Sequence, residues 1–216
     1  MKKWTYSAEL ERRYYSTSLN DRTAISYSHL DPYLVGSVGL DFFRAQSVLD
    51  IGAGEGIYSA WIADPAHGAA SRVLGIELTE HRIRRDYEER LPNLRFVSGD
   101  IFEMEPQPED FDVIFMNLVL HHLRFRLDDV LEYVRTSLKP NGKFLAFEPN
   151  CFNPAALIVH TVRGHSANEG FMSPRHVKQK LRDHYFNDVD VGYFWRDRWW
   201  AKNPLVASSF WIQGRK

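Results

Sequence analysis

The amino-acid sequence predicts an α/β fold in which helices flank a mostly parallel sheet. Short apolar runs rich in β-branched and aromatic residues alternate with helical patterns over residues 46–147, and this alternation builds parallel strands joined by right-handed crossovers. A glycine-rich turn joins the first strand to its helix. The last two apolar runs are separated by a proline-marked segment that is too short for a helical crossover, which favours an antiparallel pair at one sheet edge.

The first strand and the turn after it carry the clearest signal in the chain. The strand is expected over residues 46–51, and Gly52, Gly54 and Gly56 follow at alternate positions. Glycine adopts positive φ without a Cβ penalty and lets the backbone approach a ligand closely. The helix expected over residues 55–63 begins in this turn, so its first N–H groups can face a ligand. The pattern predicts a cradle for a nucleotide-like cofactor.

Six more strands and the helices between them follow in order. The strands are expected over residues 73–78, 94–97, 111–117, 143–147, 189–194 and 208–213. Thr79 is expected to cap a charged helix that ends near Arg90, and Asp128 to cap another. The apolar face of this second helix is formed by Val130, Leu131, Val134 and Leu138.

Proline and glycine signals complete the prediction of elements. Residues 139–142, Lys-Pro-Asn-Gly, are typical of a turn before the strand at 143–147. Asn153-Pro154 and Ser173-Pro174 each combine an N-cap residue with proline at the first helical position, and so predict two more helices.

Length and composition narrow the class of protein. A chain of 216 residues with 44% hydrophobic and 25% charged residues is typical of one globular domain. A net charge of -1 provides no general attraction to nucleic acid. Cys151 is the only cysteine, so no intramolecular disulfide can form, and a cytoplasmic location is expected. Neither a signal peptide nor an apolar run of the ~20 residues that span a bilayer is found, so no membrane partner is expected.

Polar residues follow consecutive strands where an open parallel sheet binds its ligands. Glu77 ends the second strand, and a carboxylate at that place accepts hydrogen bonds from both hydroxyls of a ribose. Asp100 follows the third strand and can accept from an adenine amino group, while Ile101 can pack on the ring. Asn117 ends the fourth strand. Taken singly, Glu77 also fits a surface acid and Asp100 a helix cap or turn residue, so the prediction rests on their joint spacing.

The glycine pattern distinguishes between cofactor classes. The dinucleotide-binding fingerprint needs glycine where Ile57 stands, which disfavours a nicotinamide-dependent oxidoreductase. The chain instead resembles class I S-adenosylmethionine-dependent methyltransferases of the small-molecule (type 11/12-like) branch. The resemblance covers residues 48–149, in the segments 48–56 (VLDIGAGEG), 75–78 (GIEL), 99–101 (GDI), 111–123 (FDVIFMNLVLHHL) and 138–150 (LKPNGKFLAFEPN). It implies a Rossmann-like three-layer sandwich with a seven-stranded sheet whose last strand is antiparallel.

The resemblance also implies a cofactor site. S-adenosylmethionine would bind there and leave as S-adenosylhomocysteine, with Asp50 reaching the methionine amino group directly or through water. The glycine turn would contact the methionine and ribose portions, and Asn117 and Leu118 would lie near the methionine moiety. The residues assigned to the cofactor are Asp50, Gly52, Ala53, Gly54, Gly56, Tyr58, Glu77, Leu78, Asp100, Ile101, Asn117 and Leu118. No metal site is assigned.

Methyl transfer from a sulfonium is an in-line displacement with a neutral leaving group, so holding the reactants in line can supply most of the rate. A general base helps if the acceptor is a hydroxyl. His121 or His122, after the fourth strand, is the candidate base, and Glu148 is a further candidate. The alternatives are catalysis by positioning alone and, for Glu148, a contact that orders the turn after it. A covalent role for Cys151 is disfavoured, because enzymes that use such an adduct bind nucleic acid.

Three aromatic segments lie outside the cofactor motifs. Residues 1–45 are expected to form a helical lid on the methyltransferase domain at 46–216, and residues 151–173 to form an inserted cap. Candidate substrate contacts in these two segments are Tyr14, Tyr15, Tyr27, His29, His160 and Arg163. The third segment, around Trp195–Lys202, joins aromatic and basic residues. Packing is the alternative role for all three.

The sequence therefore predicts an enzyme that methylates the oxygen or nitrogen of a small molecule. The alternatives are a methyltransferase acting on RNA or protein, which only the Trp195–Lys202 segment favours, and a non-catalytic subunit that binds S-adenosylmethionine. The acceptor is not identified by the sequence, and whether the chain forms a homodimer stays open.

Overall fold

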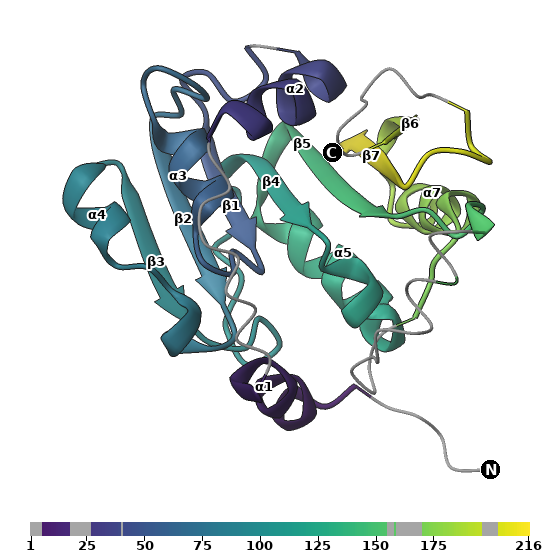
Figure 1. The fold of residues 1–216 in the computed structure, drawn as a ribbon, viewed down its shortest axis with the longest axis horizontal. Coiled ribbons are helices and arrows are strands. Elements are labelled where there is room, and N and C mark those ends of the chain that lie inside the picture. The colour runs from purple at the N-terminus through teal and green to yellow at the C-terminus, as the bar shows by residue number, and fades with distance from the viewer. Residues whose placement is uncertain (1–5, 18–26, 40, 155–157, 159–169, 196–202) are drawn as a thin grey trace.

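A seven-stranded sheet forms the middle of the computed structural model, which describes residues 6–17, 27–39, 41–154, 158, 170–195 and 203–216 (Figure 1). The strand order is β3-β2-β1-β4-β5-β7-β6. The strands are β1 (Ser47–Ile51), β2 (Arg72–Glu77), β3 (Leu94–Ser98), β4 (Phe111–Asn117), β5 (Leu138–Pro149), β6 (Asn187–Phe194) and β7 (Ser209–Arg215). The α-helices are α1 (Ala8–Thr17), α2 (Tyr27–Val38), α3 (Ile57–Ala63), α4 (Asp86–Arg90), α5 (Leu127–Ser137) and α7 (Pro174–Asp183). Short 3₁₀ turns are η1 (Glu80–Arg82), η2 (Leu120–His122) and η3 (Arg124–Arg126).

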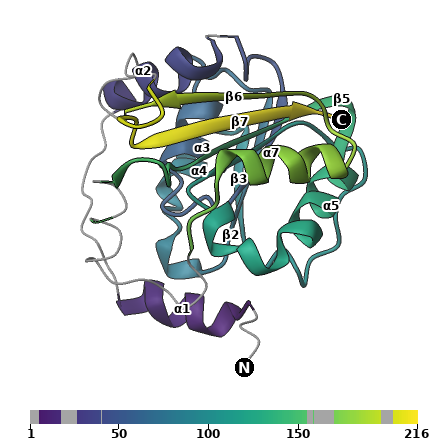
Figure 2. The same cartoon turned by 90° about the vertical axis from the view of Figure 1, so that its right-hand side faces the viewer.

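The pairing of the strands confirms the predicted sheet. Strands β3, β2, β1, β4 and β5 pair in parallel. Strand β7 runs antiparallel to both β5 and β6. Figure 2 shows α7 lying against this antiparallel pair. Because the parallel strands all point the same way, their carboxyl ends meet at one edge of the sheet, where ligands of such folds bind.

Apolar side chains alternate between the two faces of the sheet and build a separate core on each. On β4, Val113 and Phe115 belong to the core that α2 and α3 cover, which also buries Trp61. Ile114 and Met116 belong to the opposite core, under α5 and α7. This burial on both faces is the reason that the apolar run over 111–117 predicted the bounds of β4 correctly.

The predicted helix from Thr79 to Arg90 was wrong in its extent. The chain forms the short η1 turn, becomes extended at Ile83 and starts α4 at Asp86. The hydroxyl of Thr79 donates to Glu77 Oε1 at 2.9 Å and does not cap a helix. Ile83 is buried in the core beneath α3, so its burial and the Glu77 contact both favour the interruption.

The predicted cap at Asp128 was also wrong, although the apolar face of that helix was correct. Asp128 lies inside the first turn of α5 and accepts hydrogen bonds from Lys180 Nζ at 2.8 Å and His184 Nε2 at 2.9 Å on α7. These two partners hold the pKa of the Asp128 carboxyl below its usual value. Leu138, expected on the helix face, is the first residue of β5.

Two turn signals had different outcomes. Residues 139–142 are an irregular part of β5, where Asn141 has a φ of +64° and the register with β4 shifts. Ser173 caps α7 as predicted, because its hydroxyl accepts from the backbone N–H of His176 at 3.1 Å. The helix expected after Asn153-Pro154 falls mostly outside the described residues. Within the described residues, no helix has both the length and the apolar character needed to cross a bilayer.

Candidate functional site

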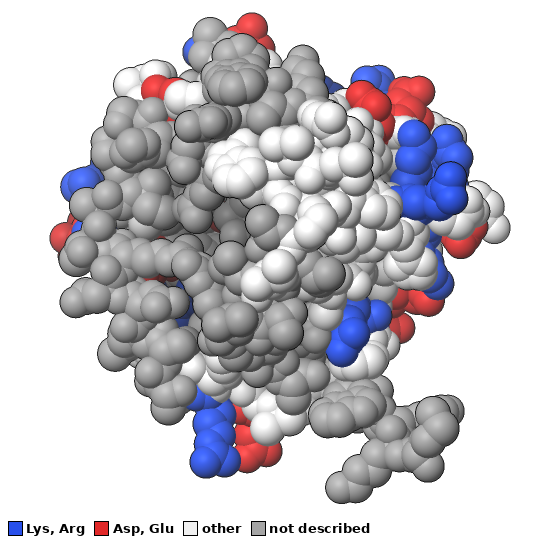
Figure 3. Space-filling model, turned by 45° about the vertical axis from the view of Figure 1, so that its right-hand side comes forward, with Lys and Arg blue, Asp and Glu red and all other residues white. Residues whose placement is uncertain are grey.

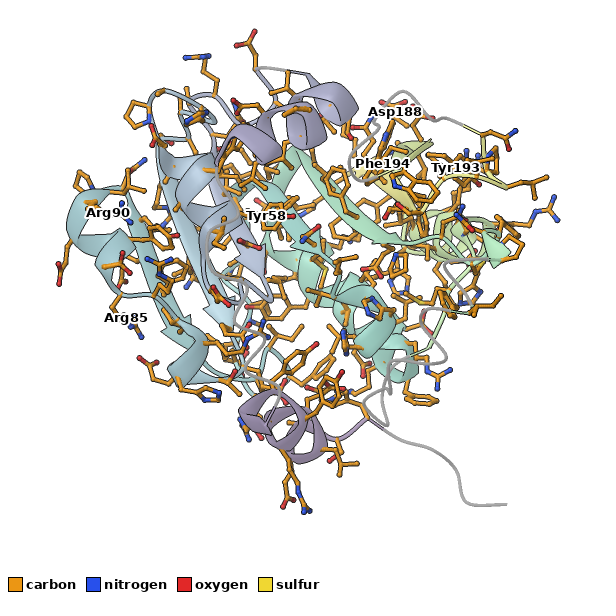
Figure 4. All side chains as sticks on the ribbon, in the orientation of Figure 1. Tyr58, Arg85, Arg90, Asp188, Tyr193 and Phe194 are labelled. Atoms are coloured by element: carbon orange, nitrogen blue, oxygen red, sulfur yellow. The ribbon has the colours of Figure 1, made fainter. Side chains whose placement is uncertain are left out.

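A cavity of about 610 Å³ lies where the parallel strands end. Its walls come from the turn after β1, the ends of β2 and β4, the segment after β3, and helix α1. The structure brings together the predicted cofactor residues Asp50, Gly52, Ala53, Gly54, Tyr58, Glu77, Leu78, Asp100, Ile101, Asn117 and Leu118 on these walls. Tyr58 projects from α3 toward β4, with its ring 6.0 Å from that of Phe115 (Figure 4).

The turn after β1 is held by backbone hydrogen bonds to the end of β2. The N–H groups of Gly52 and Ala53 both donate to the Ile76 carbonyl, at 2.8 and 3.0 Å. Gly52 has a φ of +75°, and a Cβ there would collide with the side chain of Val119. Glycine at this position is therefore required by its conformation and by a protein neighbour, in addition to any ligand.

Gly56 is the one predicted cofactor residue that does not line the cavity. Its φ is +81°, and a Cβ would collide with the ring of Phe96 on β3. Gly39 offers a matched comparison, because its φ is +93° but a Cβ added there would have nothing within 4 Å. The glycine at 56 thus serves the packing of α3 on the sheet.

Gly56→Ala is therefore expected to destabilise the fold more than Gly39→Ala does. Positive φ costs an L-residue about 1–3 kcal/mol, and both variants carry that cost. Overpacking against Phe96 adds about 1–3 kcal/mol for Gly56→Ala alone. Urea denaturation of both variants measures the difference. Equal losses of unfolding free energy would contradict the packing role.

The Glu77 carboxylate is buried in the cavity wall and ties two loops together. Its Oε2 accepts from the backbone N–H of Gly54 at 2.8 Å. Its Oε1 accepts from the backbone N–H of Thr79 at 3.2 Å and from the Thr79 hydroxyl at 2.9 Å. Arg82 Nη1 lies 3.9 Å from Oε1. A carboxylate offers about four acceptor positions, so these contacts leave capacity for a ligand hydroxyl.

Asp50 is the most deeply placed acid of the cavity. Burial raises the pKa of its carboxyl to about 7, and the negative charge of Glu77 adds to the rise. The Ser59 hydroxyl on α3 opposes it by donating to Asp50 Oδ2 at 2.5 Å. Asp50 is therefore partly protonated at neutral pH, and a cation in the cavity would favour its charged form.

Asp100 is held in a tight turn after β3. Its Oδ1 accepts from the backbone N–H of Phe102 at 3.0 Å. The hydroxyl of Tyr6, just before α1, hydrogen-bonds to the same carboxyl, and burial together with the Asp100 charge raises the pKa of Tyr6. Ile101 is buried beside it. The segment before α1 thus reaches the acid that was assigned to the adenine.

Glu148 lies behind the cavity wall and is not part of it. Its carboxylate accepts from the backbone N–H groups of Val119, Leu120 and His121, at 3.0, 2.7 and 3.3 Å. It also accepts from His121 Nδ1 at 2.7 Å. Glu148 therefore orders the turn after β4 and orients His121, whereas its place in the sequence had indicated a candidate base. Of the three candidate catalytic residues, His121 and His122 line the cavity.

His122 contacts helix α1. Its Nε2 lies 3.0 Å from the Tyr15 hydroxyl, and its Nδ1 lies 3.4 Å from Glu11 Oε2. The guanidinium of Arg82 lies 4.4 Å from the centre of the Tyr15 ring. Glu11 and Arg82 were missed by sequence reasoning. The spacing of Glu11 and Tyr15, four residues apart on one helix face, was the available signal for Glu11.

The predicted substrate contacts divide into two groups. Tyr14 and Tyr15 line the cavity. The side chains of Tyr27 and His29, and residues His160 and Arg163, lie outside the described part of the chain, as does most of the Trp195–Lys202 segment. On the face shown in Figure 3, the described Lys and Arg side chains lie beside Asp and Glu and form no continuous basic patch. Among the described residues, no group of three or more His, Cys, Asp or Glu is placed to hold a metal ion.

Known proteins share this sequence pattern and this fold. A family model described as a methyltransferase domain matches residues 43–190, more than half of the chain. The chain is similar to a SAM dependent methyltransferase from Archaeoglobus fulgidus, with 18% identity, 97% of this chain and 95% of that chain covered, and a TM-score of 0.64. None of the curated proteins matches the sequence.

Two further solved structures are similar in fold. Haemonchus contortus phosphoethanolamine N-methyltransferase 2, in complex with S-adenosyl-L-methionine, shares 16% identity over 88% of this chain and 51% of that chain, with a TM-score of 0.65. A DhpI–SAM–HEP complex shares 18% identity over 96% of this chain and 97% of that chain, with a TM-score of 0.67. At these identities the likeness establishes the fold.

Proposed function

Because this chain belongs to the methyltransferase domain family, we propose that it transfers the methyl group of S-adenosylmethionine to the oxygen or nitrogen of a small molecule. The observation that carries the proposal is the pair of buried carboxylates, Asp50 and Glu77, in one cavity beside the glycine turn. Carboxylates suit the two groups that this cofactor presents, an ammonium and a pair of ribose hydroxyls.

The cavity residues fit the cofactor along its length. Asp50 would hold the methionine ammonium, Glu77 the ribose, and Asp100 with Ile101 the adenine. Asn117 and Leu118 would lie near the methionine moiety. When bound, the cofactor supplies a methyl group on a sulfonium, whose departure as a neutral thioether requires no oxyanion hole. The chain's own contribution is to hold the acceptor in line and to exclude water.

A small-molecule acceptor is favoured by the size and covering of the site. A volume of about 610 Å³ lies in the range of small-molecule sites, which span about 300–1,000 Å³. Helix α1 contributes Glu11, Tyr14 and Tyr15 to the wall, which supports a lid for this part of the predicted segment 1–45, whereas α2 packs into the core beside α3. The phosphoethanolamine N-methyltransferase with a similar fold bears the name of a small acceptor. An inserted cap at 151–173, a cytoplasmic location and a homodimer stay predictions.

Titration calorimetry with S-adenosylmethionine, S-adenosylhomocysteine, NAD and NADP tests the cofactor assignment. Binding of the first two ligands and of neither dinucleotide is expected. Incubation with methyl-labelled S-adenosylmethionine and a panel of small alcohols and amines then tests turnover. Label transfer to RNA or protein, or cofactor binding without any turnover, would favour the alternative functions.

The affinity for S-adenosylmethionine is expected to rise with pH because of Asp50. A cation binds the ionised carboxylate, and the pKa of free Asp50 is about 7, so the proton must leave before the ammonium is held. Between pH 6 and pH 8 the dissociation constant should fall by about tenfold, less any loss of the ligand's own ammonium near pH 8. Calorimetry in buffers of different ionisation enthalpy measures the released proton. Asp50→Asn should bind weakly with no such rise, and an unchanged pH profile in that variant would exclude Asp50.

A further inference from the structure

We propose that Glu11, His122 and Tyr15 form a proton relay, completed by helix α1, that deprotonates the methyl acceptor at the Tyr15 oxygen. The inference rests on the proposed methyl transfer. Tyr15 is the catalytic residue in this relay, His122 receives its proton, and Glu11 is a positioning residue. All three line the cavity.

The distances place the His122 ring between the side chains of Tyr15 and Glu11. The Tyr15 oxygen lies 3.0 Å from His122 Nε2, and Glu11 Oε2 lies 3.4 Å from Nδ1 on the other side of the ring. An ionised carboxylate only accepts hydrogen bonds, so it favours the tautomer with the proton on Nδ1. The lone pair is then on Nε2, where it accepts from the Tyr15 hydroxyl.

Glu11 is more deeply buried than its neighbours along α1. Glu11 is 3% exposed, whereas its neighbour Leu10 is 46% exposed. Placing a carboxylate inside while an apolar side chain faces solvent costs free energy, unless the acid meets a specific partner. The Nδ1 edge of His122, 3.4 Å from Glu11 Oε2, is such a partner, because a carboxylate at this distance favours positive charge and an N–H on that side of the ring.

The neighbouring histidine provides a contrast within the same turn. The Glu148 carboxylate that faces His121 also accepts three backbone N–H groups and lies outside the cavity wall. That pair orders the turn after β4. The pair of Glu11 and His122, by comparison, joins the turn after β4 to α1, and His122 also contacts the hydroxyl of Tyr15, a residue that lines the cavity.

The relay accounts for each proton and electron pair. The acceptor loses its O–H or N–H proton to the Tyr15 oxygen, as Tyr15 passes its own proton to His122 Nε2. With the cofactor bound, the acceptor lone pair would form the bond to the methyl carbon, and the carbon–sulfur pair would return to sulfur. His122 is left as an imidazolium beside Glu11, and its proton later passes to water. Arg82, 4.4 Å from the Tyr15 ring centre, stabilises negative charge on the phenol during the transfer.

Nitrogen-detected NMR of the ¹⁵N-labelled full chain tests the relay without any ligand. The tautomer of His122, assigned with His122→Gln, is expected to carry its proton on Nδ1. Glu11→Gln should reduce the share of this tautomer, because a neutral amide holds the Nδ1 proton less strongly than a carboxylate does. The matched control is Glu9→Gln, an exposed acid on the same helix, which should leave the tautomer of His122 unchanged.

Turnover is the second measurement. With an acceptor from the panel, Tyr15→Phe should reduce kcat by about 10²–10⁴-fold while the dissociation constant of S-adenosylmethionine is unchanged. A wild-type His122 with its proton on Nε2, a tautomer insensitive to Glu11→Gln in a folded variant, or full turnover by Tyr15→Phe would overturn the relay. Failure of S-adenosylmethionine to bind in calorimetry would overturn the proposed function itself, and the role of the relay with it. If Glu11→Gln does not fold, the tautomer of His122 in the unaltered chain is enough to support or overturn the relay.

Discussion

Glu77→Ala is expected to weaken the binding of S-adenosylmethionine by about tenfold to a few hundredfold. Each hydrogen bond to a charged group contributes roughly 1.5–3 kcal/mol, and the ribose offers two hydroxyls. The variant also releases the Gly54 N–H and the Thr79 hydroxyl, which Glu77 holds at 2.8 and 2.9 Å. The glycine turn is then less well ordered for the ligand, which adds to the loss.

Calorimetry on folded protein measures this effect, and circular dichroism verifies the fold. Glu80→Ala is the matched control, because its side chain is 61% exposed and pairs only with Arg85 in the described contacts. That variant should bind S-adenosylmethionine as the unaltered chain does. If folded Glu77→Ala retains full affinity, Glu77 has no part in holding the ribose.

Glu148→Ala is expected to cause the largest loss of stability among single changes near the site. The substitution removes the acceptor of three backbone N–H groups and of His121 Nδ1, all in a buried turn. Removing one partner of a buried charged pair costs about 3–5 kcal/mol. For a chain of this length, that corresponds to a fall in Tm of about 6–20 °C.

Thermal and urea unfolding monitored together measure the loss. Glu132→Ala on α5 is the control, because its side chain is 67% exposed and a surface acid contributes little. Glu148→Gln keeps one acceptor oxygen and should fall between the two. A loss for Glu148→Ala within about 0.5 kcal/mol of the control would show that the turn after β4 does not depend on this carboxylate.

Several elements were predictable because their causes lie within a few residues. The run at 111–117 is apolar on both faces and therefore predicted β4 without error. Ser173-Pro174 predicted the start of α7, because a cap acts on N–H groups only two or three residues away. The predicted helix after Thr79 was wrong because the Glu77 carboxylate binds the Thr79 hydroxyl and the core beneath α3, built by residues distant in the sequence, buries Ile83.

The cofactor site likewise has features that follow from the nearby sequence and features that depend on residues distant in the sequence. Parallel strands bring their carboxyl ends to one edge whatever the details of packing, so the spacing of Asp50, Glu77, Asp100 and Asn117 was enough to predict a common cavity. Gly56 belonged to the same motif, yet its neighbour is Phe96 on β3, which no local pattern reveals.

The sequence by itself determined the order of strands and helices, the glycine turn and the acids at the strand ends, since these depend on periodicity and turn chemistry between near neighbours. Only the tertiary structure decided which buried polar groups meet. Tyr15 and His122 are 107 residues apart, and Glu148 and His121 are 27 apart. A buried carboxylate or imidazole must find a partner wherever the packed chain brings one, and that choice is made by the packing of α1 and β5 around the cavity.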